Sequence, residues 1–454
     1  MKNMTFEPLR WQEDPVRIAV FHDTEYLQAY FQVTAPRDIE WICKGRPVEE
    51  LPRILTILSP SHHLASAKAL DRLFGVEPPP MARNMREALL QAHIFRHHLR
   101  KLYFLISSRH NPFLDRQKRG NRGEPQLFPP HFLDEIMHHE ALSQEAATIL
   151  GGRCDHPLSA VTGGVSRFLK EDHYHRLSEI AEFCLKFAMR VGEFLRDEIF
   201  GDGKALDALG STYEQNLQVE PMVSLTLAEK DGNVVLRDPA GKEMDRFSPD
   251  MMFEKIGFHN ESWTHEPFAY IKGTSENATR KVQEQIGNIF HSEFPIPNPE
   301  FFFVGPLARL NSGEALGYPL AEEERQRLIE VLGPFPHFGV VAAYWALLVE
   351  LVQAAEKMTG LYAQEKLTGP AIRTIPSEMG QVGHAVLESP QGLIFHHYRT
   401  DQKGIVEEVE VLGTGTGNNA LRCLLTQKAV DISQARGEAW EETKNRIEIS
   451  LLPF

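Results

Sequence analysis

Histidine side chains are the first candidates for metal binding or proton transfer in this sequence. The chain has 20 histidines, and several of them stand in adjacent pairs. His93 and His97 are four residues apart within a helical pattern, and this spacing can present two ring nitrogens to one metal ion. No glutamate follows as in the H-E-x-x-H motif, so we interpret both as surface histidines or hydrogen-bonded core histidines.

A glycine-rich stretch, GTGTGNN at residues 413–419, is a second candidate. It lies between a predicted strand and a predicted helix, where backbone N–H groups can hold an anion. As a variant of the dinucleotide motif G-x-G-x-x-G it lacks the third glycine and a clean βαβ unit. We therefore expect a loop here rather than a nucleotide site.

Cysteines are few and scattered along the chain. They are Cys43, Cys154, Cys184 and Cys423. No two of them form a C-x-x-C pair, so the sequence suggests neither a disulfide framework nor a thiolate metal site, and the cytoplasm is the expected compartment. We interpret Cys43 and Cys184 as structural core residues.

Charge and hydropathy argue against binding to nucleic acid and against insertion into a membrane. The 48 basic residues are outnumbered by 62 acidic ones, and a formal net charge of −14 argues against nucleic-acid binding. Residues 1–20 are polar and broken by prolines, unlike a signal peptide. The most apolar run, residues 340–355, is interrupted by Glu350 and Gln353 and is shorter than the roughly 20 residues that span a bilayer. We expect a buried helix there and no membrane span.

The hydrophobic periodicity predicts an α+β chain that is predominantly helical. Strands are expected at 16–36, at 222–238 around an Asp231-Gly232 turn, and at 384–412. Residues 108–130 are expected to form a long surface loop, because they mix proline, glycine and basic residues without a period. Helices are expected at 61–74, 84–107, 131–150, 175–200, 320–332, 337–358, 418–436 and 438–451.

Six blocks of the sequence are similar, in order, to blocks of one enzyme family. They are DIEWICKGRPVEELPRI (38–54), SHHLASAKALDRLFGVEPPPMARNMREALLQAH (61–93), HPLSAVTGGVSR (156–167), FVGPLARLN (303–311), SPQGLIFHHYRTDQKGIV (389–406) and GTGTGNNA (413–420). On these blocks the chain resembles the large subunit of nickel-iron hydrogenases, nearest to the cytoplasmic kind that works with NAD(P) or other soluble carriers. The resemblance covers nearly the whole chain. It implies a core of long helices with small peripheral β-sheets.

The resemblance places two leucines where active members of the family have metal ligands. Those members hold nickel and iron with four cysteine thiolates, two from an early C-G-x-C stretch and two from a final D-P-C-x-x-C stretch. In RILTILSPSHH, residues 53–63, Leu55 and Leu58 stand in the first pair of places and Thr56 replaces the glycine. Leucine has no donor atom and is bulky, so we expect that the metal site is packed shut.

Two further departures from the family pattern agree with that expectation. NRIEISLLPF, residues 445–454, matches the approach to the final motif, but no D-P-C-x-x-C has appeared by Phe454. We therefore expect that the second thiol pair and the family's C-terminal metal-binding histidine are absent. Where the family has A-P-R-G, this chain has Ser389-Pro390-Gln391-Gly392, and Gln391 cannot supply the fixed cation of that arginine.

Other family positions are matched less completely. Glu13 lies near the family's proton-relay glutamate, although its neighbours WQEDP differ from the usual R-x-E-G-H. Glu40 matches a glutamate that binds a structural magnesium ion, whose histidine partner belongs to the final motif, so we expect no magnesium. His62 matches a histidine beside the first cysteine pair and could hydrogen-bond within the former pocket. The vestigial pocket is thus expected to comprise Leu55, Leu58, His62, Ser389, Pro390, Gln391 and Thr416.

The resemblance implies one domain with alternating regions. They are an N-terminal β region at 1–54, helical core at 55–200 and 301–383, a β-containing insertion at 215–300, a β region at 384–417 and C-terminal helices at 418–454. We infer a large subunit without hydrogenase activity or its own cofactor, acting as a scaffold in a cytoplasmic redox complex. The expected partners are an iron-sulfur small subunit and further NAD(P)- or ferredoxin-linked subunits.

Two alternatives remain open at this stage. The emptied pocket could bind another substrate or electron acceptor, and a void lined by His62, Gln391 and Thr416 would favour that function. Nickel-iron chemistry with atypical ligands is the other alternative.

Overall fold

The most apolar run of the chain forms the buried helix α12 (Val340–Gln364) at the centre of a layer of long helices. Residues 340–355 are buried, apart from the half-buried Gln353. The helix packs against α4 (Pro80–Ser107), α6 (Glu171–Leu195) and α11 (Pro319–Leu332). This confirms the predicted buried helix. Within the described ranges, every helix is too short or too polar to cross a lipid bilayer.

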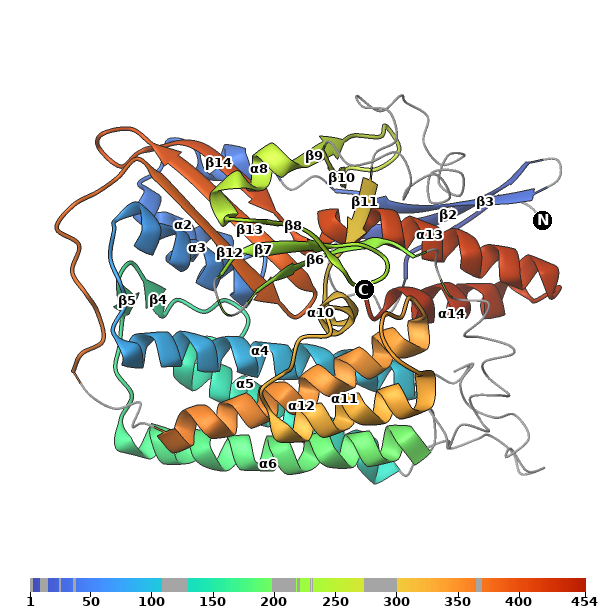
Figure 1. The fold of residues 1–454 in the computed structure, drawn as a ribbon, viewed down its shortest axis with the longest axis horizontal. Coiled ribbons are helices and arrows are strands. Elements are labelled where there is room, and N and C mark those ends of the chain that lie inside the picture. The colour runs from blue at the N-terminus through green and yellow to red at the C-terminus, as the bar shows by residue number, and fades with distance from the viewer. Residues whose placement is uncertain are drawn as a thin grey trace.

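The computed structural model describes residues 3–8, 15–23, 26–35, 38–107, 130–197, 218, 221–228, 230, 232–272, 300–364 and 370–454. The other helices are α1 (Ile39–Cys43), α2 (Leu51–Leu55), α3 (Pro60–Leu73), α5 (Pro130–Gly151), α8 (Met252–Lys255), α10 (Pro306–Asn311), α13 (Thr414–Ala435) and α14 (Trp440–Leu451). Figure 1 shows the long helices as one layer, with the β-sheets on one side of it.

The described residues also form four small sheets. One holds β1 (Met4–Phe6), β2 (Val16–Asp23) and β3 (Tyr26–Val33), and another holds β12 (Val382–Ser389), β13 (Gly392–Thr400) and β14 (Val406–Leu412). The six-stranded sheet has the order β8-β7-β6-β11-β10-β9, and β4 (Ala160–Val161) pairs with β5 (Gly164–Val165). The remaining bounds are β6 (Val223–Leu227), β7 (Val234–Arg237), β8 (Glu243–Phe247), β9 (Ile256–His259), β10 (Phe268–Ile271) and β11 (Glu300–Phe303).

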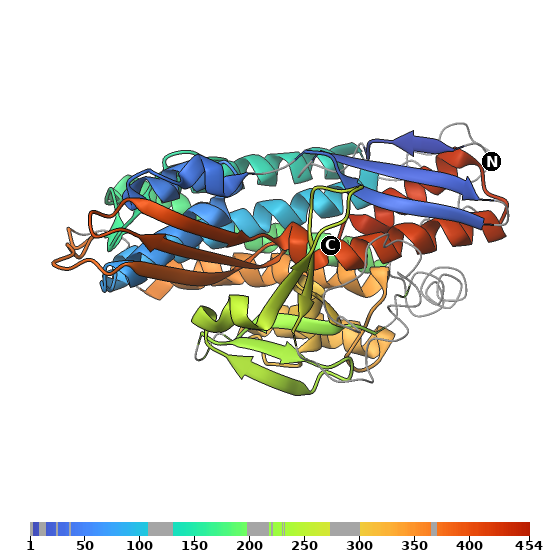
Figure 2. The ribbon, with the colours of Figure 1, turned by 90° about the horizontal axis from the view of Figure 1, so that it is seen from above.

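The six-stranded sheet joins segments that are distant in the sequence. The strand β11 pairs in parallel with β6, whereas the other neighbours in this sheet are antiparallel. In Figure 2 this sheet projects from one side of the helical layer, and the N-terminal sheet lies beside α13 and α14. The helix α13 packs on β3, β10 and β11, so it connects the two sheets.

The predicted fold class, predominantly helical α+β with small peripheral sheets, is confirmed. Each helix predicted from periodicity is present, and the strands predicted at 16–36, 222–238 and 384–412 are hairpins or a three-stranded meander. The loop predicted at 108–130 lies almost entirely outside the described residues, as does Asp231 of the predicted turn. The division into regions stays a prediction.

The glycine-rich stretch at 413–419 differs from the expectation. It is helical from Thr414 onward, with Gly413 as the residue before the first turn. Tertiary contacts account for the difference, because Asn418 Oδ1 accepts a hydrogen bond from Val304 N at 2.9 Å and Asn419 Nδ2 donates to Glu266 O at 3.0 Å. Those contacts hold two polar residues inside a helix that their composition disfavours.

A buried ion-pair network joins α4, α10, α12 and β12. Arg309 donates to both carboxylate oxygens of Glu350, at 2.5 and 2.7 Å, and to Glu388 at 2.6 Å. His98 lies 2.9 Å from Glu350 on its other side. Although burial alone would raise the pKa of Glu350, the adjacent Arg309 and His98 lower it to about 2. The carboxylate is therefore ionised at all pH values at which the protein would be handled.

Replacement of Glu350 by glutamine is expected to lower the free energy of unfolding by about 3 kcal/mol or more, because it leaves the buried Arg309 without its closest counter-charge. Urea unfolding at neutral pH measures this loss. The matched control is Glu323→Gln, which removes an exposed ion pair with Arg327 and should cost less than about 1 kcal/mol. Equal losses in the two variants would contradict the network's proposed importance.

Candidate functional site

The turn between α2 and α3 carries the residues that the sequence placed at the former metal site. Leu55 is the last residue of α2, and Ser59 caps α3 by accepting a hydrogen bond from His62 N at 3.4 Å. Hydrogen bonds with residues 156 and 157 also hold this turn in place. Thr56 Oγ1 donates to Pro157 O at 3.1 Å, and the Nδ1 of His156 lies 3.1 Å from Thr56 O.

Leu55 is fully buried. It belongs to an apolar cluster with Leu51, Leu70 and Tyr398, and Cys43 is part of the same cluster. Leu58 is half-buried and faces a cavity. The two leucines at the places of the first cysteine pair therefore have different surroundings.

A cavity of about 510 Å³, here called the central cavity, lies beside this turn. Six of the seven predicted pocket residues line it, and only Leu55 does not. They are Leu58, His62, Ser389, Pro390, Gln391 and Thr416. The expectation that the leucines pack the site shut is thus wrong, because Leu55 turns into the apolar cluster and Leu58 alone does not fill the space.

His62 begins a chain of buried hydrogen bonds that leads inward from the central cavity. Its Nδ1 is 2.8 Å from His396 Nε2, and His396 Nδ1 is 2.5 Å from the Tyr398 hydroxyl. Tyr398 in turn donates to Ser66 Oγ at 2.8 Å. Burial, followed by the neighbouring His62, holds the pKa of His396 well below its usual range, and burial holds the pKa of Tyr398 well above its own. Both groups are therefore uncharged at neutral pH.

One set of tautomers satisfies all of these hydrogen bonds with neutral rings. With the Tyr398 proton donated to Ser66, the phenol oxygen must accept from His396 Nδ1–H. The neutral His396 then accepts at Nε2, so His62 donates from Nδ1. A neutral His62 consequently has Nε2 as its hydrogen-bond acceptor.

The Ser389–Gln391 turn forms a second part of the wall. It joins β12 to β13, and Ser389 Oγ accepts a hydrogen bond from Gln391 N at 3.3 Å. Gln391 Oε1 accepts from Thr414 Oγ1 at 3.0 Å, which ties the turn to the start of α13. Arg309 holds the turn from behind by donating to Ser389 O at 3.3 Å.

The Gln391 backbone also approaches Gly305 closely. A Cβ at Gly305 would lie 2.6 Å from Gln391 O, and Gly305 has a φ of +108°, so only glycine fits here.

Residues 265–267 and the first turn of α13 close the cavity. Glu266 accepts a hydrogen bond from Thr416 Oγ1, and its backbone oxygen accepts from Asn419. The sequence did not identify His265, Glu266 or Ser59 as pocket residues. They carry no motif, and they reach the cavity only through the packing of distant segments.

None of the four cysteines lines the central cavity. Cys184 and Cys423 lie in the main apolar core, and Cys154 accepts from Arg96 Nη1 at 2.9 Å. Burial raises the pKa of Cys43 and Cys154 to about 11 and that of Cys184 and Cys423 to about 12. All four are therefore protonated thiols at neutral pH.

Comparison with known proteins finds relatives that match the chain over most of its length. No protein-family model matches the chain. An iron-sulfur subunit of the F420-non-reducing hydrogenase of Archaeoglobus profundus is 27% identical over 471 residues, which cover 100% of this chain and 93% of that protein. The NAD-reducing hydrogenase HoxS subunit beta of Cupriavidus necator is 24% identical, covering 95% of this chain and 88% of that protein.

Solved structures agree over the whole length. A chain of an NAD+-reducing nickel-iron hydrogenase in the H2-reduced state superposes with a TM-score of 0.83 at 21% identity, covering 100% of this chain and 97% of that one. In sequence the chain is thus similar to hydrogenase subunits over its whole length, and its fold is that of a nickel-iron hydrogenase chain. A nickel-iron-selenium hydrogenase from Desulfovibrio vulgaris Hildenborough is more distant, with a TM-score of 0.69 at 14% identity over 99% of this chain and 98% of that one.

The residues that this large-subunit homologue places at the cavity do not fit a four-thiolate centre. Where soft, charged sulfur would be needed, the turn offers the hydrocarbon side chain of Leu58, and Leu55 is outside the cavity altogether. Among the described residues, no three histidine, cysteine or acidic side chains are placed to share a metal ion.

Glu13 and Glu40 were also assigned roles from the resemblance, and the structure describes only Glu40. Glu13 lies outside the described residues, so its assignment as a proton relay stays a prediction. Glu40 lies on α1, where its exposed carboxylate pairs with Lys44 at 3.5 Å. It does not line the central cavity, and nothing in its described surroundings favours a magnesium site.

His63 connects the turn between α2 and α3 to neighbouring segments through two hydrogen bonds. Its protonation should make the free energy of unfolding depend on pH. Its Nδ1 donates to Pro52 O at 2.8 Å, and its Nε2 accepts from Ala160 N at 3.0 Å, so the folded state needs the neutral ring. Burial lowers its pKa from 6.5 to about 4. The unfolded chain therefore binds the proton more readily, and the stability that His63 contributes is present above pH 6.5 and is lost as the pH falls toward 4.

The expected loss across this window is about 3 kcal/mol. Urea unfolding of the wild type and of His63→Gln across the window measures it. The variant should be less stable at neutral pH, and its stability should fall less steeply on acidification. His173→Gln, an exposed histidine on α6, serves as the control and should keep the wild-type slope. Parallel pH profiles for all three proteins would refute the assignment.

Proposed function

We propose that this large-subunit homologue is non-catalytic and acts as a structural scaffold in a multi-subunit iron-sulfur oxidoreductase complex. The observation that carries the proposal is that none of the four cysteines reaches the central cavity, together with leucines at both places of the family's first cysteine pair. Nickel and iron in this family depend on charged sulfur ligands, and a hydrocarbon side chain cannot replace them.

The neutral Gln391 supports the same proposal. Its amide oxygen is engaged with Thr414, and it replaces a family arginine at the open metal position. An amide cannot provide the fixed positive charge of a guanidinium group. The loss of ligands and the loss of the cation affect different segments of the chain, so they are independent of each other.

A partner explains why the fold persists without the metal chemistry. The relatives are named as subunits of F420-non-reducing and NAD-reducing hydrogenases. We propose that the partners here are a small subunit with iron-sulfur clusters and further NAD(P)- or ferredoxin-linked subunits. Obligate interfaces of this kind commonly bury more than about 2,000 Å². Trp41 and Ile57 are 79% and 56% exposed, and Ile57 lies at the central cavity, so both are suited to such an interface.

A cytoplasmic location is part of the proposal. All four cysteines are free in the structure, and thiols stay reduced in the cytoplasm.

A second candidate function rests on the central cavity. Its volume of about 510 Å³ is within the range of small-molecule sites, and His62, Gln391 and Thr416 all line it. This arrangement favours the alternative in which the former metal pocket accepts another substrate or electron acceptor. The imidazole of His62 and the carboxylate of Glu266 supply hydrogen-bonding groups on two sides of the space.

Purification of the native complex tests the proposal directly. We expect a tagged chain to recover an iron-sulfur small subunit, while the complex contains no nickel and shows no infrared bands of iron-bound carbon monoxide or cyanide. Metal analysis of the same sample gives the iron and nickel content. Stoichiometric nickel with those infrared bands would disprove the non-catalytic assignment, and a chain that is monomeric in the native extract would disprove the scaffold.

Filling the central cavity separates the two candidate functions. Val411→Phe introduces a ring at the cavity wall, whereas Val411→Ile adds one methylene group and serves as the control. If the chain is a scaffold, both variants should assemble and support the wild-type rate of electron transfer through the complex. A loss of rate of about tenfold or more in the phenylalanine variant alone, with assembly intact, would favour a reactant in the cavity.

A further inference from the structure

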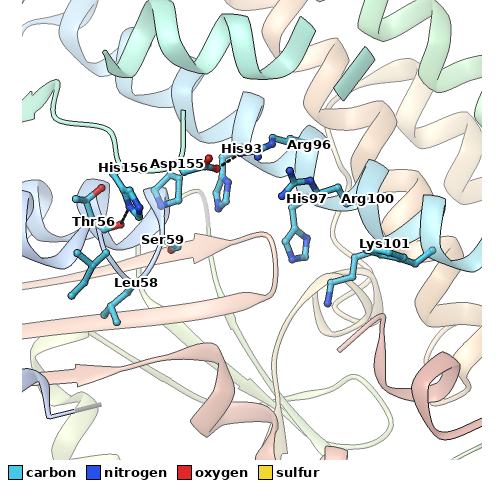
Figure 3. Close-up of a pocket in the computed structure, with 13 residues that line it drawn as sticks. Thr56, Leu58, Ser59, His93, Arg96, His97, Arg100, Lys101, Asp155 and His156 are labelled. Atoms are coloured by element: carbon cyan, nitrogen blue, oxygen red, sulfur yellow. Dashed lines mark hydrogen bonds and ion pairs between the residues drawn. The ribbon is translucent and has the colours of Figure 1, made fainter. Parts of the chain in front are cut away.

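A second cavity, of about 250 Å³, adjoins the central cavity and has a different chemical character. The two share the wall formed by residues 57–59, His93 and His97. Basic side chains of α4 make up much of the remaining lining, so this second space is called the basic cavity (Figure 3).

One face of α4 points a row of nitrogen-bearing side chains into the basic cavity. His93, His97 and Lys101 are spaced four residues apart, which places them on one side of a helix, and Figure 3 shows them projecting in the same direction. Lys101 is only 9% exposed. Lys101 therefore places a cationic side chain at the wall of the basic cavity.

The adjacent face of α4 adds two arginines that are already held in place. Arg96 donates to Asp155 at 2.5 Å, and Arg100 donates to Glu140 at 2.5 Å. Asp155 is the one carboxylate among the residues found to line the basic cavity, and its side chain is 66% exposed. Glu140 pairs with both Arg96 and Arg100 but does not line the cavity.

The opposite wall, in the part of the chain that the structure describes, contains hydroxyl groups and no acidic side chain. Thr56 and Ser59 come from the turn before α3, and Pro60 is the first residue of that helix. The positive end of a helix of 14 residues therefore faces the same space as the basic side chains.

The basic groups around His93 change its pKa in the same direction as burial does. Burial and then the nearby His97, Arg96, His98 and Arg100 hold it well below its usual range. His93 is therefore neutral at neutral pH and keeps one ring N–H to donate.

We propose that the basic cavity binds a small oxyanion, of the size of phosphate, sulfate or a short dicarboxylate. The observation behind this is the convergence of Lys101, Arg96 and Arg100 on a partly open cavity with hydroxyl groups on its far side. Its volume of about 250 Å³ is sufficient to admit such an anion. The site does not depend on whether the chain is catalytic, because no residue of the former metal site other than Leu58 is part of it.

Isothermal titration calorimetry of the full chain, with sodium phosphate, sulfate and malonate in a chloride buffer, tests the proposal. We expect saturable binding of at least one of the three at millimolar concentrations. Lys101→Met keeps the length of the side chain but removes its charge, and should weaken binding about tenfold or more. His97→Gln should weaken it as well, and covers the case in which the methionine variant does not fold.

The matched control is Lys186→Met, which removes the same charge from an exposed ion pair on α6 and should bind like the wild type. A selenate soak of the crystallised chain should place the anomalous selenium signal between Lys101 and Ser59. Three results would overturn the proposal: no binding by the wild type, equal binding by all variants, or binding only of an acidic glutamate peptide. The last would assign the cavity to a carboxylate side chain of a partner protein.

Discussion

The burial of Arg309 between two carboxylates is the constraint on which the site depends. Its guanidinium group holds Glu350 of α12 and Glu388 of β12, and it also donates to the backbone of Ser389. A buried charge of this kind must be matched in place, since an unpaired one would cost several kcal/mol. The helical layer and the sheet of β12–β14 are thereby fixed relative to each other, and the turn that carries Gln391 is fixed with them.

That rigidity explains how an open cavity persists between these segments. Each segment around the central cavity is anchored by contacts that do not involve a metal: the turn after α2 by Thr56 and His63, and the Ser389–Gln391 turn by Arg309. Close packing would collapse an empty space if its walls could move. Here the walls belong to separately stabilised elements, and the space between them is lined by imidazole, hydroxyl and amide groups.

The elements themselves were largely predictable from local patterns. Periodicity located the long helices and the hairpins, since the spacing of apolar residues reflects a buried face directly. The start of α13 at Thr414 was missed because glycine and asparagine disfavour helices, and the contacts of Asn418 and Asn419 that overcome this come from distant segments. The parallel pairing of β11 with β6 was equally invisible, because no local signal specifies a partner far along the chain.

The sequence excludes thiolate and guanidinium groups at positions 55, 58 and 391, because the side-chain chemistry of Leu55, Leu58 and Gln391 needs no coordinates. It also grouped Leu58, His62, Gln391 and Thr416 correctly at one cavity. Only the tertiary structure decided that Leu55 points into an apolar cluster, that the cavity stays open, and that His265 and Glu266 help to line it. The direction of a buried side chain and the volume left beside it depend on the packing of segments hundreds of residues apart, and a linear pattern does not encode that packing.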